Sequence, residues 1–270
     1  MQINDSLTMQ DWMDVYRTLV RWELELQDVA GDMKEMLAMQ KREANNEFSK
    51  FVRKNYMKWM ETLVHHEQDE TRPLMSPDIF KTQIFPALDN GDKVFLIDNF
   101  RWDQWKMFQP EIAGLFNIEE NMYCSILPTA TQYARNAIFS GLMPIEIEAM
   151  FPDLWVDEDS EQGKNLNESP MVQTQLERFR RRNSFSYHKV NDSVGAEKFV
   201  QQLPTLMHND LNIVVLNFID MLSHARTESR MVRELANSEA AYRSITQSWF
   251  RHSAVSELFR TLASMDCRVV

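Results

Sequence analysis

Cysteine, glycine, proline and long hydrophobic runs are all scarce in this sequence. Two cysteines among 270 residues are too few for a disulfide framework, which favours a reducing, cytoplasmic compartment. No run approaches the roughly 18 apolar residues of a membrane-spanning helix. The first residues are polar and lack the apolar core of a signal peptide. We therefore expect a cytoplasmic protein that does not insert into a membrane.

Positive charge is also scarce. The 29 Lys and Arg residues are outnumbered by 40 Asp and Glu residues, which gives a formal net charge of -11. A general nucleic-acid-binding surface is normally basic, and no basic recognition helix stands out, so a DNA-binding domain is the weakest hypothesis. A small local phosphate site is compatible with this balance. Hydrophobic residues make up 44% of the chain, which is enough for a sizeable core.

The first part of the chain has helical periodicity with few breakers. Thr8 can cap a first helix, with Asp11 three residues later, and Gly31 separates it from a second helix. No glycine or proline occurs from 32 to 72. Apolar residues recur at helical spacing: Trp12, Val15, Tyr16, Leu19, Trp22 and Leu26, then Met36, Met39, Phe48, Phe51, Val52, Tyr56, Trp59, Met60 and Leu63. We predict a helical bundle or connector over 1–72.

From residue 73 the pattern changes to short apolar runs separated by helical segments. Four runs are expected to form buried strands: 93–98, 121–127, 185–190 and 211–217. Helices are expected around them: 77–88, 102–108, 131–140, 171–182, 194–202, 228–240 and 243–264. This alternation predicts an α/β fold over 73–270, in which helices cover both faces of a parallel sheet.

Polar side chains stand just past the ends of three of these runs. Asp98 follows the first run, Thr131 follows the second, and Asp220 with His224 follows the last. In open α/β sheets, ligands bind outside the carboxyl ends of the strands. A carboxylate, a hydroxyl and an Asp/His pair at one such edge favour a metal site and phosphoryl-transfer chemistry.

Each of these positions also has an ordinary structural explanation. Asp98 and Thr131 each suit the N-cap of a following helix. The N-terminus of a helix also offers free N–H groups and a positive dipole end, which would seat a phosphate near Thr131. Asp220 and His224 share a face if their stretch is helical, a spacing that suits zinc but also occurs by chance.

Taken together, these stretches resemble the alkaline phosphatase superfamily, and in particular its phosphodiesterase branch. In that branch a strand ends in a metal-binding Asp, and a later Pro-Thr-x-Thr segment supplies the nucleophile, with a glycine ten residues on. An Asp-x-x-x-His pair then binds a second metal. This sequence has Asp98, then Pro128-Thr129-Ala130-Thr131 with Gly141, then Asp220-Met221-Leu222-Ser223-His224.

Residues 90–270 also resemble the PglZ-type domain of response regulators that control type IX secretion, through Ile97–Trp105 and Trp249–Ser253. In those proteins a receiver domain precedes a helical bundle and the PglZ domain. The resemblance implies a homodimeric two-component effector whose partners are a histidine kinase, a sigma factor and cytoplasmic secretion-system components. The receiver's acidic pocket and the last part of the PglZ domain have no counterpart here, so we expect a chain truncated at both ends.

The same resemblance implies a zinc-dependent phosphodiesterase or phosphatase that acts on short oligonucleotides. Asp98 and Thr131 would belong to one zinc site, and Asp220 and His224 to the other, with the remaining ligands expected beyond Val270. Thr131 would attack phosphorus and form a covalent phosphothreonine.

Contacts with the substrate are expected from Arg101, Arg135 and His252. Each arginine lies within a few residues of an expected ligand, and His252 lies in the Trp249–Ser253 segment. The acidic charge balance favours a short anionic ligand held by a few arginines over long duplex DNA.

The alternative hypothesis is a non-catalytic signalling module. In it, the bundle and the α/β domain dimerise and dock onto a secretion-system component or a sigma factor. The long helices expected over 8–66, with their methionine and tryptophan stripes, favour this alternative. Zinc-dependent hydrolysis of a generic phosphodiester would distinguish the enzyme from the module.

Overall fold

The computed structural model describes residues 3–4, 6–27, 29, 31–65, 72–98, 100–155 and 167–270, apart from the side chains at 219, 220, 223 and 226–228. The chain divides into two compact units. The first contains Met1–Leu74 and Met122–Cys124, and the second contains Met75–Asn121 and Ser125–Val270.

The first unit is built on two helices, α1 (Met9–Glu25) and α2 (Asp32–Val64), as the periodicity predicts. The Thr8 side chain accepts a hydrogen bond from the Asp11 N–H, and the Asp11 carboxylate accepts one from the Thr8 N–H. This reciprocal capping box satisfies two N–H groups that the helix would leave unpaired. Trp12, Val15 and Leu19 of α1 pack with residues of α2.

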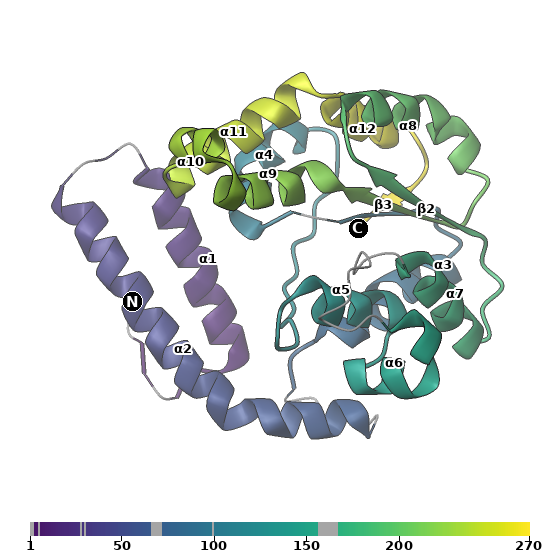
Figure 1. Cartoon of the computed structure of the whole chain (residues 1–270), viewed down its shortest axis with the longest axis horizontal. Coiled ribbons are helices and arrows are strands. Elements are labelled where there is room, and N and C mark those ends of the chain that lie inside the picture. The colour runs from purple at the N-terminus through teal and green to yellow at the C-terminus, as the bar shows by residue number, and fades with distance from the viewer. Residues whose placement is uncertain are drawn as a thin grey trace. The chain divides into compact units, whose positions relative to one another are not determined.

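The second unit is an α/β domain around one sheet of four parallel strands (Figure 1). The strands are β1 (Val94–Asp98), β2 (Phe185–Val190), β3 (Leu211–Leu216) and β4 (Arg268–Val269). Their order in the sheet is β2-β3-β1-β4. The predicted fold class is confirmed, and β2 has the predicted bounds.

Helices and short helical turns connect these strands. In chain order they are η1 (Ser76–Asp78), η2 (Phe80–Ile84), α3 (Phe85–Asp89), α4 (Trp102–Ile112), α5 (Thr131–Ser140), α6 (Pro144–Met150), η3 (Pro152–Leu154), α7 (Glu168–Arg178), α8 (Ser193–Leu206), α9 (Asn217–Glu228), α10 (Arg230–Leu235), α11 (Glu239–His252) and α12 (Ala254–Ala263). The helix expected over 243–264 is divided because Ser253 caps a new helix by accepting a hydrogen bond from the Val255 N–H.

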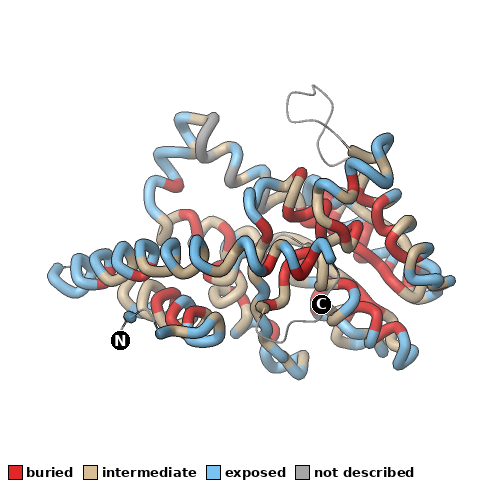
Figure 2. Tube along the Cα trace, turned by 90° about the horizontal axis from the view of Figure 1, so that it is seen from below, coloured by how far each residue is buried: buried red, intermediate tan, exposed pale blue. Residues whose placement is uncertain are grey.

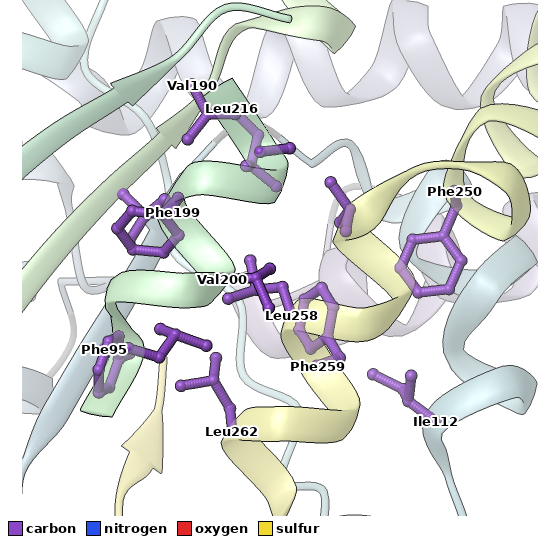
Figure 3. Packing of buried hydrophobic residues seen from close by; sticks show 14 of the residues in the cluster. Phe95, Ile112, Val190, Phe199, Val200, Leu216, Phe250, Leu258, Phe259 and Leu262 are labelled. Atoms are coloured by element: carbon purple, nitrogen blue, oxygen red, sulfur yellow. The ribbon is translucent and has the colours of Figure 1, made fainter. Parts of the chain in front are cut away.

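Side chains alternate between the two faces of the sheet and feed two separate cores. Val94 and Ile213 pack on one face with residues of α3, α5 and α7. Phe95 and Val214 pack on the other face with residues of α8, α11 and α12. Figure 3 shows side chains of this second core from α8 and α12 gathered beside Phe95. Every residue of β3 is buried, whereas β2 is mostly half-buried. Figure 2 shows buried stretches gathered in the interior and exposed residues on the outer sides of the helices.

The strand predicted over 121–127 is wrong. This segment is extended but pairs with the chain before η1, where the Cys124 N–H donates to the Leu74 carbonyl at 2.8 Å. A central parallel strand would be buried on both faces, yet Tyr123 and Leu127 are 43% and 51% exposed. Thr131 therefore follows an extended connection and not a strand of the sheet.

Gly141 ends α5 in the left-handed conformation, at φ 63°. A Cβ there would overlap the side-chain amide of Gln175, which is completely buried on α7. We expect Gly141→Ala to lower the free energy of unfolding by about 1–3 kcal/mol, because it adds both backbone strain and a clash. Urea denaturation measures this loss.

Gly114→Ala is the matched control, since a Cβ at Gly114 meets nothing within 4 Å and its backbone is not left-handed. Equal urea midpoints for the two variants would contradict the argument.

Candidate active site

The carboxyl edge of the sheet carries a carboxylate and an ammonium on either side of β3. Asp98 of β1 and Lys189 of β2 are both register partners of Val215. Both side chains lie on the sheet face that α5 and α7 cover, because Asp98 alternates with Val94 and Lys189 with Tyr187. The sheet thus places opposite charges at the edge where ligands of this fold class bind.

A buried carboxylate on α7 connects these two strands. The Nε atom of Arg135, on α5, lies 2.9 Å from Asp98 Oδ2 and 2.8 Å from Glu168 Oε1. Lys189 Nζ lies 3.2 Å from Glu168 Oε2, and the Tyr187 hydroxyl donates a hydrogen bond to the same oxygen. We call these five residues the Glu168 cluster. It joins β1, α5, α7 and β2 by direct polar contacts.

Burial within the Glu168 cluster is graded. The Glu168 side chain is 0% exposed and that of Arg135 is 10% exposed, whereas those of Asp98 and Lys189 are 27% and 30% exposed. A carboxylate this deeply buried requires paired charges and hydrogen bonds. Two cations and two carboxylates balance the formal charge of the cluster.

Tyr187 supplies the cluster with a neutral donor. Burial raises the pKa of its hydroxyl above the ordinary value, and the hydrogen bond and negative charge of Glu168 raise it further. The phenol therefore stays protonated and donates a hydrogen bond to Glu168.

Thr131 is the first residue of α5 and is half-buried. It precedes Arg135 by one turn, so the two residues share a face of the helix. Because the Arg135 side chain contacts Asp98, the second turn of this helix lies within side-chain reach of the carboxyl end of β1. The N-cap residue is Ala130, which offers no side-chain acceptor to the first N–H groups of the helix.

The structure rejects the capping explanations for two predicted residues. Ala130, and not Thr131, is the N-cap of α5, while Arg101, and not Asp98, is the N-cap of α4. Helix capping therefore does not account for the presence of Thr131 or Asp98 at these positions.

Asp220 and His224 lie one turn apart on α9, which begins directly after β3. The stretch is helical, which is the condition for the two residues to share a face, and His224 is exposed. The Asp220 side chain lies outside the described residues, so the geometry of this pair stays a prediction.

The described residues do not supply the ligand set of a zinc site. Across the described ranges, no three His, Cys, Asp or Glu residues are grouped so as to hold a metal ion. Asp98 has its Oδ2 atom against Arg135. A catalytic zinc typically has three protein ligands, so the described donors do not form a zinc site by themselves.

Two other predicted residues lie apart from the Glu168 cluster. Arg101 makes a two-bond ion pair with Asp103, at 2.9 and 2.6 Å, and also pairs with Glu239 at 2.8 Å. His252 is exposed at the end of α11. Neither has a polar contact with the cluster within the described part of the chain. A role in substrate binding stays a prediction for both residues.

Sequence reasoning identified Asp98 and Arg135 but missed Glu168, Tyr187 and Lys189. One weak signal was present, since Lys189 is a charged residue near the end of a predicted strand, although β2 is an edge strand in which only Val190 is buried. Glu168 gave no such signal, because the acidic stretch around it is typical of a surface loop.

Comparison with known proteins places the second unit in a family. Residues 79–269 match the family model described as the BREX system PglZ alkaline phosphatase-like domain. The chain belongs to the PglZ family. Residues 1–60 match the PorX response regulator linker domain, so the chain has the organisation of a PorX-like response regulator effector. No curated protein matches the chain.

These matches confirm the resemblance drawn from the sequence, in both the helical part and the α/β part. The PglZ match also indicates a hydrolase of the phosphatase superfamily. Among the helices that the structure describes, none is long and apolar enough to cross a membrane.

We expect Tyr187→Phe to lower the free energy of unfolding by about 1–3 kcal/mol, because Glu168 then loses a donor while it remains buried. The folded-state pKa of Tyr187 is raised, so this contribution is fully present below the unfolded-state pKa of about 10 and is lost as pH rises above it. Urea titrations from pH 7 to pH 11 should show the difference between wild type and Tyr187→Phe shrinking above about pH 10.

Tyr133→Phe is the control, since its hydroxyl makes no hydrogen bond among the described residues. A gap between wild type and Tyr187→Phe that stays constant up to pH 11 would refute the assignment.

Proposed function

We propose that this chain is the effector part of a response regulator and that its PglZ domain hydrolyses phosphodiesters of the oligonucleotide type, with Thr131 as nucleophile and zinc as cofactor. The observation that carries the proposal is the position of α5. Its first residue is Thr131, its N-cap has no side-chain acceptor, and Arg135 reaches Asp98 from the next turn.

The residues of α5 have separate tasks in this scheme. The N–H groups and positive dipole end of α5 attract a phosphoryl oxygen, and the Arg135 guanidinium adds a fixed positive charge. Attack by Thr131 Oγ forms a new bond to phosphorus while the bond to the leaving alkoxide breaks. The proton of the Thr131 hydroxyl passes to solvent, where the leaving alkoxide takes one up. Water then cleaves the bond between the threonine and phosphorus and releases a phosphate monoester.

Asp98, Asp220 and His224 would hold the metal ions, together with ligands that the described residues do not supply. Zinc, when bound, would stabilise charge on the phosphoryl oxygens and lower the pKa of the nucleophile's hydroxyl. The net charge of -11 supports short oligonucleotides over long duplex DNA as substrates.

The linker match supports a signalling context. We propose the partners implied by the resemblance: a histidine kinase, a sigma factor and cytoplasmic components of type IX secretion, with a homodimer as the working state in the cytoplasm.

A second candidate is the non-catalytic docking module. Four methionines of α2 are more than half exposed: Met33, Met36, Met39 and Met57. Exposed methionines adapt readily to partner surfaces, which is the specific observation in favour of this candidate.

The two candidates are separated by zinc content and by hydrolysis of bis-p-nitrophenyl phosphate, measured on the whole protein. We expect stoichiometric zinc and turnover that falls at least about 100-fold in Thr131→Val, because the covalent step is lost. Thr129→Val is the matched control, since Thr129 is an exposed threonine just before α5.

Turnover that survives Thr131→Val would remove the nucleophile assignment. Zinc-driven dimerisation without turnover would support the docking module in place of the enzyme.

A further inference from the structure

Glu168 has no role in the proposed hydrolysis by Thr131, although it is the most buried charge of the cluster. Its side chain is 0% exposed and is shared by Arg135 and Lys189, with Tyr187 as a third partner. Burying a carboxylate with two cations stabilises a fold little when apolar residues could fill the same space. The arrangement therefore calls for an explanation other than stability.

The position of Arg135 and its unsatisfied N–H groups offer an explanation for the buried carboxylate. The cluster lies at the carboxyl edge of the sheet, where Asp98 and Lys189 flank Val215 and remain partly exposed. Among the described residues, the Nε and Nη2 atoms of Arg135 are both buried and make no hydrogen bond, although Nε lies within 2.9 Å of a carboxylate oxygen of Asp98 and of Glu168. A buried donor left unpaired is costly and calls for a partner.

We propose that Glu168 is a positioning residue that holds Arg135 and Lys189 as a pair of cations for a phosphoryl group, and that Lys189 is a second phosphate-contacting residue. This inference rests on the proposed function, since it concerns the same site. Glu168 is the anchor because it is the most buried member, and Lys189 can reach a ligand because its side chain is 30% exposed. Arg135, whose side chain keeps 10% exposure, would add its positive charge to the same site.

The direction in which Glu168→Gln changes phosphate affinity distinguishes a positioning role of Glu168 from an effect of net charge alone. Glu168→Gln changes the formal charge of the cluster from zero to +1. If net charge alone governed binding, the variant would bind inorganic phosphate more tightly than wild type. If Glu168 positions the two cations, phosphate binding weakens despite the added positive charge.

We expect the dissociation constant for inorganic phosphate, measured by isothermal titration calorimetry on the whole protein, to rise about tenfold in Glu168→Gln. Glu177→Gln, an exposed carboxylate on the same helix, should leave it unchanged. Glu168→Asp should restore part of the affinity, because it returns the carboxylate. Unchanged or tighter phosphate binding by a folded Glu168→Gln protein would overturn the inference.

Lys189→Met tests the same proposal at a partly exposed residue. It can therefore decide the question even if Glu168→Gln does not fold. We expect phosphate binding to weaken about tenfold, with the exposed Lys198→Met on α8 as control. Wild-type affinity in Lys189→Met, or no phosphate binding by wild type, would refute it. Diester hydrolysis is measured separately. Phosphate binding that depends on Glu168 as expected, but without turnover, would reject the proposed hydrolase activity and leave the phosphate site in place.

Discussion

The ion pairs of the wholly buried Glu168 are the constraint on which the arrangement of the site depends. One carboxylate on α7 contacts a cation on α5 and a cation on β2, and the α5 cation also reaches the end of β1. Low local dielectric strengthens these attractions, and it also makes each partner indispensable to the others. The position of α5, and with it that of Thr131, follows from this balance of charges as well as from apolar packing.

Much of the fold could be predicted because periodicity is a local property. The capping box at Thr8, the bounds of β2 and the glycine that ends α5 all depend on residues close in sequence. The prediction for 121–127 is wrong because an apolar run fixes neither its pairing partner nor, here, its burial, since Tyr123 and Leu127 are exposed. Here that partner is Leu74, which no pattern within the run encodes.

The site could be predicted only in part, for a related reason. Asp98 and Arg135 were found because each stands beside a recognisable strand end or helix start. Glu168 and Lys189 were missed, since a charged residue looks the same in sequence whether it is solvated or paired in a core. The Asp220 and His224 assignment depends on a side chain outside the described residues and remains a prediction.

The positions of the cluster members along the chain have a consequence for folding. Asp98, Arg135, Glu168 and Lys189 are far apart in sequence, and their contacts require strands and helices that are themselves joined by long connections. Contacts of high sequence separation form only after loop closure has been offset by other interactions. Local helices such as α1 and α2 can form early, whereas the edge that carries the site is complete only once β1, α5, α7 and β2 have all come together, so the capacity to bind a ligand there reports a completed α/β domain.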